Sequence, residues 1–310
     1  MYDGVLVIGA TGFIGRSIVP MLSSIFDKVY TISRRESCFD ASLKINHHRC
    51  SLDNVVILKK ILKKCNVVIH LASETNPGTS ILQPYLEATN NLLPSLRFLE
   101  CLQEFPHVIL VYVSTGGAIY GDVDMAKVPE SIPLSPLSYY GAGKAALEKF
   151  IGAFSRQAGN TTIILRPSNI YGPGQYYRKG FGIIPTIFEK ILKKEDLHVW
   201  GDGKIIRDYL YIDDFVSFFK ILIKNIFFEK SINIYNVGSS AGLSLNDLIL
   251  IIENKTKNKL NVVYQRNRKI DVKSIVLDCS LAINKFVWRA NTSIEKGIEK
   301  TWDWYRLHRI

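Results

Sequence analysis

The feature that most constrains the fold is a glycine-rich turn directly after an apolar run near the beginning of the sequence. Val5 to Ile8 has the composition of a buried strand, and Gly9, Gly12 and Gly15 follow it before a helix-like segment. Glycines in this setting allow a tight turn and a close backbone approach, and a helix N-terminus offers unpaired N–H groups to a pyrophosphate. The segment therefore predicts a dinucleotide-binding turn. Its expected contact residues are Gly9, Thr11, Gly12, Phe13, Ile14 and Gly15.

Apolar strand-like runs alternate with helix-length segments through the first half of the chain. The expected strands are Val5 to Ile8, Val29 to Ser33, Val67 to Leu71, Val108 to Ser114 and Thr162 to Leu165. The expected helices lie near Ile14 to Ser24, Asn54 to Lys64, Tyr85 to Leu102 and Tyr140 to Ala158. This alternation is typical of an α/β fold, a doubly wound parallel Rossmann sheet with helices on both faces. The length of 310 residues and the 47% hydrophobic composition exclude a mainly disordered chain.

The alternation weakens after Gly172, where glycine, proline and tyrosine gather in a loop-like stretch. The strand-like Tyr209 to Ile212, the apolar helix after it and Ile234 to Val237 are expected to return to the sheet. We therefore predict a dinucleotide-binding domain over residues 1–171, with 207–238 returning to it. Residues 172–206 and 239–310 are expected to form a smaller C-terminal lobe that binds the substrate.

Charge and cysteine content narrow the possible partners. The net charge is +11, but the lysine clusters are not interleaved with aromatic residues as on a nucleic-acid surface. The five cysteines lack metal-ligand spacing, and His47 and His48 have no acidic or cysteine cluster nearby. Phe215 to Phe228, the most apolar stretch, contains two lysines and is too short for a bilayer. We expect no metal, no nucleic acid and no membrane partner and, because no leader segment is visible, a cytoplasmic protein.

Six further motifs follow the glycine turn along the chain. They are Val67–Ser73, Ser114–Gly121, Tyr140–Lys144, Arg166–Gly174, Gly201–Gly203 with Arg207–Tyr209, and Asn236–Gly238. With these motifs the sequence resembles the extended short-chain dehydrogenase/reductase family, whose members are epimerases, dehydratases and reductases of nucleotide sugars. It is most similar to the nucleotide-sugar 4-keto reductases and 4-epimerases, and the resemblance covers nearly the whole chain.

Tyr140 and Lys144 lie one helical turn apart, so their side chains share a helix face. In isolation this spacing is common on ordinary amphipathic helices. The family resemblance implies that the pair carries the proton of the reaction and that Lys144 also holds the ribose of the cofactor. A neighbouring ammonium favours the phenolate form of a tyrosine, which lets the group exchange protons near neutral pH.

The resemblance also implies a serine or threonine hydroxyl beside the catalytic tyrosine. Counting back from the following Tyr-Gly pair places that hydroxyl on Gly116, so Thr115 is the first candidate and Ser114 the second. In a regular strand Thr115 would point to the other face, unless the glycine pair forms a bulge. The dehydratases of the family carry an adjacent aspartate and glutamate after the threonine, whereas this chain has Gly116 and Gly117. Dehydration is therefore not expected.

The end of the second expected strand decides how the adenosine ribose is held. It reads Ser33-Arg34-Arg35, with Ser33 where the epimerase-like members carry aspartate. An acidic residue there accepts hydrogen bonds from the hydroxyls of NAD, whereas arginines suit the extra phosphate of NADP. We predict NADP (NADPH) as the cofactor, with NAD as the alternative. The remaining expected cofactor contacts are Ser51, Leu52, Leu71, Ala72 and Ser73.

Asn169, Arg207 and Arg268 resemble the residues that hold the substrate, the arginines as a clamp for its diphosphate. The resemblance and the arginine pair together predict NADPH-dependent reduction of the 4-keto group of a nucleoside-diphosphate 4-keto-6-deoxyhexose. The expected carrier is deoxythymidine diphosphate and the expected purpose is deoxysugar and surface-polysaccharide synthesis. The alternative is a uridine-diphosphate hexose 4-epimerase with tightly bound NAD. The resemblance also implies a homodimer, paired through the helices near Tyr85 to Leu102 and Tyr140 to Ala158.

Overall fold

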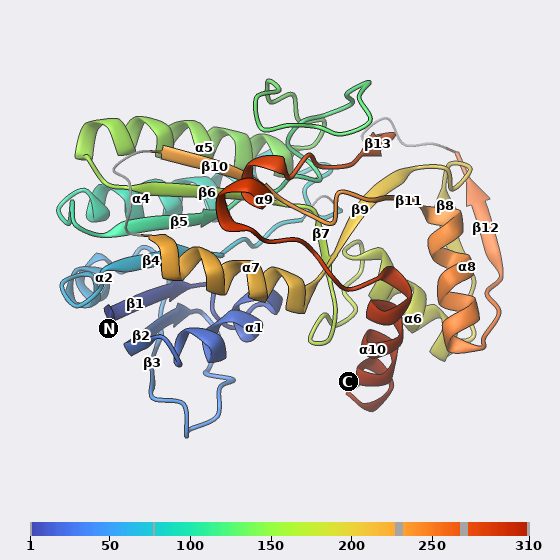
Figure 1. Ribbon diagram of the computed structural model, residues 1–310, viewed down its shortest axis with the longest axis horizontal. Coiled ribbons are helices and arrows are strands. Elements are labelled where there is room, and N and C mark those ends of the chain that lie inside the picture. Colours follow the sequence, from blue (N-terminus) through green and yellow to red (C-terminus); the bar gives the residue numbers. More distant parts are fainter. Residues whose placement is uncertain (1, 77, 227–231, 267–271, 309–310) are drawn as a thin grey trace.

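The computed structural model describes residues 2–76, 78–226, 232–266 and 272–308. Within these ranges seven strands form one parallel sheet in the order β10-β6-β5-β4-β1-β2-β3. The strands are β1 (Tyr2–Ile8), β2 (Phe26–Ser33), β3 (Ile45–Arg49), β4 (Val67–His70), β5 (Ile109–Val113), β6 (Thr162–Pro167) and β10 (Ile232–Val237). The predicted doubly wound α/β fold is therefore confirmed, and the strand order changes direction between β1 and β4 (Figure 1).

Helices cover both faces of this sheet (Figure 1). One face carries α1 (Phe13–Leu22) and α7 (Ile212–Asn225), and the other carries α2 (Val55–Leu62), α4 (Leu93–Leu102) and α5 (Tyr139–Ala158). Successive strand residues alternate between the two faces: Val5 and Val7 join one buried cluster, and Leu6 and Ile8 join the other. This double burial explains why the strands read as continuous apolar runs.

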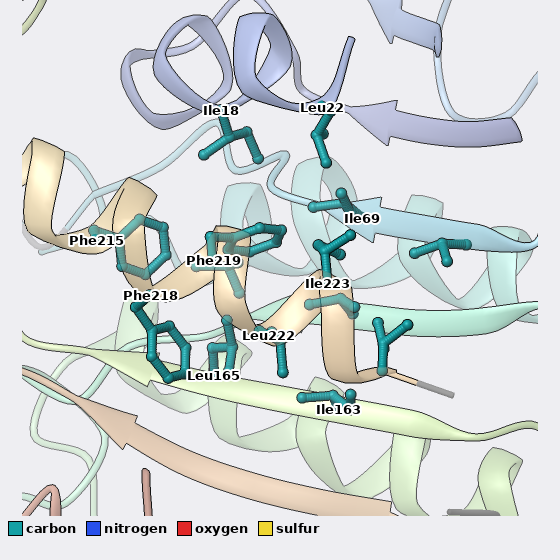
Figure 2. Close-up of a cluster of buried hydrophobic side chains, with 14 of the residues drawn as sticks. Ile18, Leu22, Ile69, Ile163, Leu165, Phe215, Phe218, Phe219, Leu222 and Ile223 are labelled. Atoms are coloured by element: carbon teal, nitrogen blue, oxygen red, sulfur yellow. The ribbon is translucent and has the colours of Figure 1, made fainter. Parts of the chain in front are cut away.

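The cluster under α1 and α7 joins segments that are far apart in the sequence. Figure 2 shows aromatic and aliphatic side chains of α7 facing α1 and the strands β4 and β6. Full burial of such a side chain contributes about 1.5–3 kcal/mol to stability. The labelled residues are Ile18, Leu22, Ile69, Ile163, Leu165, Phe215, Phe218, Phe219, Leu222 and Ile223. The apolar helix α7 thus packs on the seven-stranded sheet, as predicted.

The expected continuous helix from Tyr85 to Leu102 is interrupted. It consists of α3 (Pro84–Glu87), a π-helical turn η1 (Ala88–Leu92) and α4. Pro94, at the start of α4, has no backbone N–H and cannot donate the hydrogen bond that a continuous α-helix needs there. π-helical turns inside helices are rare and occur frequently at functional sites.

The second lobe is built around two small sheets. One has the order β11-β9-β13 with β7 also paired to β9, and the other pairs β12 with β8. The strands are β7 (Asn169–Tyr171), β8 (Leu197–Trp200), β9 (Ile206–Tyr211), β11 (Gly242–Ser244), β12 (Val262–Gln265) and β13 (Ser274–Ile275). Helices α6 (Ile183–Lys193), α8 (Leu245–Thr256) and α10 (Ile294–Leu307) complete this lobe around their own buried cluster (Figure 1).

The boundary between the lobes differs from the expected one at three places. β7 and β9 belong to the small sheet, so residues 207–211 do not return to the large sheet, whereas α7 and β10 do. In addition, α9 (Ser280–Phe286) packs on β10 with Ala282 and Phe286 in the first-domain cluster. The hydrophobic pattern of a strand shows that it is buried but not which sheet it joins, which is why the sequence misplaced β9.

Candidate active site

The glycine turn between β1 and α1 has the geometry that a dinucleotide requires. Gly9 has φ +82°, and a Cβ there would lie 2.7 Å from the backbone nitrogen of Ala72, which follows β4. A Cβ at Gly15 would lie 2.6 Å from the carbonyl carbon of Ala10, so that glycine lets α1 pack on the turn. Gly12 is the N-cap of α1 and no side chain caps the helix, which leaves amides of the first turn for a ligand. These residues fit a dinucleotide pyrophosphate.

The expected contacts after β4 lie beside this turn. The N–H of Leu71 donates to the carbonyl of Ile8 at 2.9 Å and extends the β1–β4 pairing, and Ala72 follows against Gly9. Ser73 lies at the surface of the same loop and its hydroxyl donates to the carbonyl of Thr75 at 3.2 Å. The place where strand order changes direction, between β1 and β4, is the usual ligand crevice of such sheets.

The end of the crevice expected to hold the adenosine contains both charged and uncharged side chains. The Ser33 hydroxyl ends β2 and donates to the carbonyl of Arg35 at 2.8 Å. Arg34, one of the two arginines predicted to face a phosphate, forms a surface ion pair with Glu74. Beyond β3, Ser51 is exposed and donates to the carboxylate of Asp53 at 3.2 Å, while Leu52 is buried in the core.

Two further exposed arginines, Arg16 and Arg178, lie near Arg35. Partial desolvation, and then the guanidinium groups of Arg35 and Arg16, lower the pKa of Arg178. Arg16 lies in the first turns of α1, where its Nε donates to the carbonyl of Thr11 at 3.0 Å. The loop that carries Arg178 also passes close to the glycine turn, because a Cβ at Gly174 would lie 3.7 Å from the ring of Phe13. Three like charges beside the glycine turn form a site suited to an anion.

Sequence analysis did not single out Arg16 or Arg178. Arg16 directly follows the third glycine of the turn, and this position in the sequence could have identified it as a candidate cofactor contact. Arg178 lies in the tyrosine-rich loop, far from β2 in the sequence, and only the fold brings it near Arg35.

Tyr140 and Lys144 begin α5, whose N-cap Ser138 accepts a hydrogen bond from the N–H of Gly141 at 3.1 Å. Lys144 is 6% exposed. Its ammonium donates to the carbonyl of Val113 at 3.2 Å and lies 6.0 Å from the centre of the Tyr140 ring. It also lies 5.0 Å from the centre of the Tyr112 ring. The two predicted catalytic side chains therefore share one face of α5.

Burial dominates the ionisation of this pair. It lowers the pKa of Lys144 to about 8, although the nearby carboxylates of Glu87 and Glu148 act in the opposite direction. It also raises the pKa of Tyr140 to about 12, with the charge of Glu87 adding to the rise and a hydrogen bond with Thr115 opposing it. At neutral pH Tyr140 is therefore a protonated phenol beside an ammonium group, and the expected shift of its pKa toward neutral pH is wrong because burial outweighs the ammonium.

Thr115 reaches Tyr140 although the strand has no bulge at this point. The N–H groups of Ser114 and Gly116 donate to the carbonyls of Leu165 and Pro167, each at 2.7 Å, so pairing with β6 continues beyond the end of β5. Thr115 forms the hydrogen bond with Tyr140, whereas the hydroxyl of Ser114 is buried and has no partner in the described part of the chain. Ser114, the second candidate, does not take the expected position.

Gly116 and Gly117 directly follow Thr115 in the sequence. A Cβ at Gly116 would lie 2.5 Å from the side chain of Leu277, and one at Gly117 would lie 3.4 Å from the Asn169 amide oxygen. The absence of a side chain at Gly116 thus lets Leu277 pack closely. Its absence at Gly117 leaves space beside the Asn169 amide.

The predicted substrate residues fall partly outside the described structure. The Asn169 amide donates to the carbonyl of Asp208 at 3.1 Å, which places it beside Arg207 on β9. Burial raises the pKa of Tyr209 to about 12, and the positive charge of Arg207 acts against that rise. Arg268 lies outside the described residues.

Among the described residues, no group of three His, Cys, Asp or Glu side chains could hold a metal ion. Over the same ranges, no helix has both the length and the apolar character needed to span a membrane.

The sequence pattern of the NAD dependent epimerase/dehydratase family matches residues 5–238. The dTDP-4-dehydro-6-deoxyglucose reductase of Escherichia coli is 28% identical over 309 residues, which covers 96% of this chain and 96% of that protein. The crystal structure of Thermotoga maritima UDP-glucose 4-epimerase with UDP-glucose has a TM-score of 0.88 at 29% identity and covers 98% of this chain and 99% of that one.

A second solved structure contains the cofactor. The UDP-glucose 4-epimerase of Thermus thermophilus, in complex with NAD, has a TM-score of 0.87 at 26% identity, over 99% of this chain and 100% of that one. Named relatives thus include both a reductase and epimerases of nucleotide sugars. Because the family pattern spans most of the chain and agrees with the fold and the glycine turn, this protein belongs to the NAD-dependent epimerase/dehydratase family.

Proposed function

We propose that this protein is an NADPH-dependent reductase of the 4-keto group of a nucleoside-diphosphate 4-keto-6-deoxyhexose. The observation that carries the choice of cofactor is the basic end of the crevice: Ser33 replaces an acidic residue, and Arg35, Arg16 and Arg178 come together beside the glycine turn. Guanidinium groups are the favoured partners of a phosphate such as the 2′-phosphate of NADP. The Escherichia coli relative named as a dTDP-4-dehydro-6-deoxyglucose reductase supports both the reaction and a deoxythymidine-diphosphate carrier.

The residues at the other end of the crevice suit the reducing direction. When bound, the dinucleotide supplies the hydride that reduces the carbonyl. Tyr140 holds its proton at neutral pH because its pKa is raised to about 12, so it can give that proton to the substrate oxygen. Thr115 is placed to hydrogen-bond the same oxygen, and the ammonium of Lys144 stabilises the phenolate that remains.

The substrate's diphosphate is assigned to the lobe interface. Asn169 follows β6, and Arg207 lies on β9 of the small sheet. We assign Asn169 and Arg207, together with Arg268, to binding of the diphosphate and sugar. Such a reductase would serve deoxysugar and surface-polysaccharide synthesis of the lipopolysaccharide type.

A 4-epimerase of a uridine-diphosphate hexose, with tightly bound NAD, is the second candidate. Arg34 is engaged by Glu74 and is therefore less able to hold a 2′-phosphate. The Thermotoga structure, which is similar over nearly the whole chain, is that of an epimerase with UDP-glucose. The same Tyr140 would act there as the base.

The test is a turnover assay with both substrate classes. A dTDP-linked 4-keto-6-deoxyhexose should cause steady oxidation of NADPH, and a UDP-hexose should not change at C4. Interconversion of UDP-hexose epimers without net cofactor consumption would replace the reductase by the epimerase.

A further inference from the structure

A buried carboxylate, that of Glu87, lies in the catalytic region and has no part in the proposed proton transfer. Glu87 ends α3, immediately before the π-helical turn, and is 4% exposed. Burial raises the pKa of Glu87, and side-chain hydrogen bonds with Thr75 and Asn91 and the charge of Lys144 oppose this rise. The hydroxyl of Thr75 donates to the Glu87 carboxylate. Asn91 donates to the Thr75 hydroxyl as well, at 2.8 Å. Donors directed at a carboxylate hold it in place as an anion.

The carboxylate rests against Gly143 on α5. A Cβ at Gly143 would lie 2.7 Å from Cγ of Glu87 and closer still to its Oε1. Glycine inside a helix costs about 0.5–1 kcal/mol relative to alanine, and here it makes room for the carboxylate. Gly143 lies between Tyr140 and Lys144 in the sequence, so Glu87 packs on the segment of α5 that carries both.

The charged and titratable groups around this point come from four elements. Lys144, Tyr140 and Glu148 lie on α5, Tyr112 on β5, His70 on β4 and Glu87 on α3. Glu148 forms a buried ion pair with Arg166 at 2.6 Å. Burial lowers the pKa of His70 to about 3, so this imidazole is neutral. Glu87 is therefore the carboxylate near Lys144 whose charge no arginine neutralises among the described residues.

We propose that Glu87 is a positioning residue whose fixed negative charge keeps Lys144 as an ammonium ion and Tyr140 as a phenol. This inference concerns the catalytic pair itself and rests on the proposed function only through the direction of the reaction. In the reducing direction both protonated forms are the active ones, and an anion nearby favours both.

The sign of the expected pH effect follows from electrostatics. A negative neighbour raises the pKa of an amine and of a phenol, so removing its charge lowers both. The pKa of Lys144 is about 8, and loss of its proton should produce the alkaline limb of the reduction rate. Replacing Glu87 by a neutral residue should move this limb to lower pH, while the Tyr140 midpoint, about 12, falls but stays beyond the assay range.

The experiment compares Glu87→Gln with Glu87→Asp by a readout that needs neither substrate nor cofactor. Lysine labelled at Cε with ¹³C reports the ionisation of Lys144 by NMR, and the Lys144→Met variant assigns the signal. Glu87→Gln should lower the Lys144 midpoint by about one pH unit, the size of shift that a close charge typically causes. Glu87→Asp, which keeps the charge, should shift it by less than half as much. The alkaline limb of NADPH oxidation should move with the NMR midpoint.

A second variant covers the case in which Glu87→Gln does not fold. Glu87→Met removes the charge and leaves no carboxylate that needs the hydrogen bond from Thr75, so it should lower the Lys144 midpoint in the same direction as Glu87→Gln. An unchanged midpoint in every variant that folds, judged by circular dichroism, would overturn the proposal. Because NMR reads Lys144 alone, a failure of the reductase assignment would appear separately, as absent NADPH oxidation with the midpoint still shifted.

Discussion

The two ends of the cofactor crevice differ in how deeply their charged side chains are buried. At the catalytic end, Lys144 is 6% exposed and the Glu148–Arg166 pair beside it has side chains only 3% and 4% exposed. At the adenosine end, the Arg34 side chain is 64% exposed and its partner Glu74 is 28% exposed. Burial restricts the catalytic side chains to a single arrangement, whereas the exposed arginine side chains can exchange one hydrogen-bonding partner for another. The positions of the catalytic side chains are therefore more firmly fixed than the contacts of the exposed arginines.

The largest expected effect compares the two ion pairs directly. Arg166→Met leaves the Glu148 carboxylate buried without its partner, and such a loss costs about 3–5 kcal/mol. Arg34→Met breaks an exposed pair and should cost less than about 1 kcal/mol. Urea denaturation measures both free energies of unfolding. Equal losses of unfolding free energy in the two variants would contradict the view that burial makes the two ion pairs differ in strength.

The next effect tests the catalytic end alone. Tyr140→Phe removes the proton but keeps the ring, so turnover should fall by at least about a hundredfold while cofactor affinity changes little. Tyr139→Phe is the matched control, since Tyr139 is 46% exposed and adjacent in the sequence. Near-normal turnover of the Tyr140 variant would remove this residue from the mechanism.

A smaller effect is expected at the adenosine end. Replacing both Arg34 and Arg35 by alanine should weaken NADPH binding by about tenfold or more, since each charge-assisted bond is worth about 1.5–3 kcal/mol before solvent screening. Because Glu74 engages Arg34, Arg35→Ala alone should account for most of this loss and Arg34→Ala for little. The ratio of NADPH to NADH affinity, measured by fluorescence titration, cancels effects on stability. If the ratio is unchanged in the double variant, both arginines are only surface charges.

The smallest effect is expected at the surface through which the predicted homodimer pairs. On the helices proposed to pair, Leu93 is 56% exposed and Phe150 is 48% exposed. Light scattering at micromolar concentration should give the mass of a dimer, and Leu93→Glu should shift it toward the monomer because a charge opposes burial. The control Val56→Glu, on α2, changes a residue that is 66% exposed outside those helices and should leave the mass unchanged. A monomeric mass for the unmodified protein would rule out the pairing.

The sequence correctly predicted the features that depend on local sequence pattern. The run from Val5 to Gly15 specified a strand, a turn and a helix start, and the structure shows why Gly9 and Gly15 carry no side chain. The spacing of Tyr140 and Lys144 likewise specified a shared helix face. These features depend on neighbours in the sequence or on apolar burial, which the composition of a segment reveals.

Contacts between distant segments were not predictable in this way. The pairing of Arg34 with Glu74, the approach of Arg178 to Arg35 and the burial of Glu87 all depend on which loops the fold brings together. β9 was assigned to the wrong sheet for the same reason, because its pattern indicates burial without naming the neighbouring strand. Charged side chains give little signal in a single sequence, since most of them are solvated.

The most direct test of the reductase assignment is to measure the cofactor of the purified protein together with the stoichiometry of turnover. The reductase should be isolated without tightly held NAD and should oxidise one NADPH for each 4-keto sugar reduced, with NADH used less well. NAD retained through purification, with sugar epimers interconverted and no net loss of reduced cofactor, would contradict the assignment and identify the protein as an epimerase.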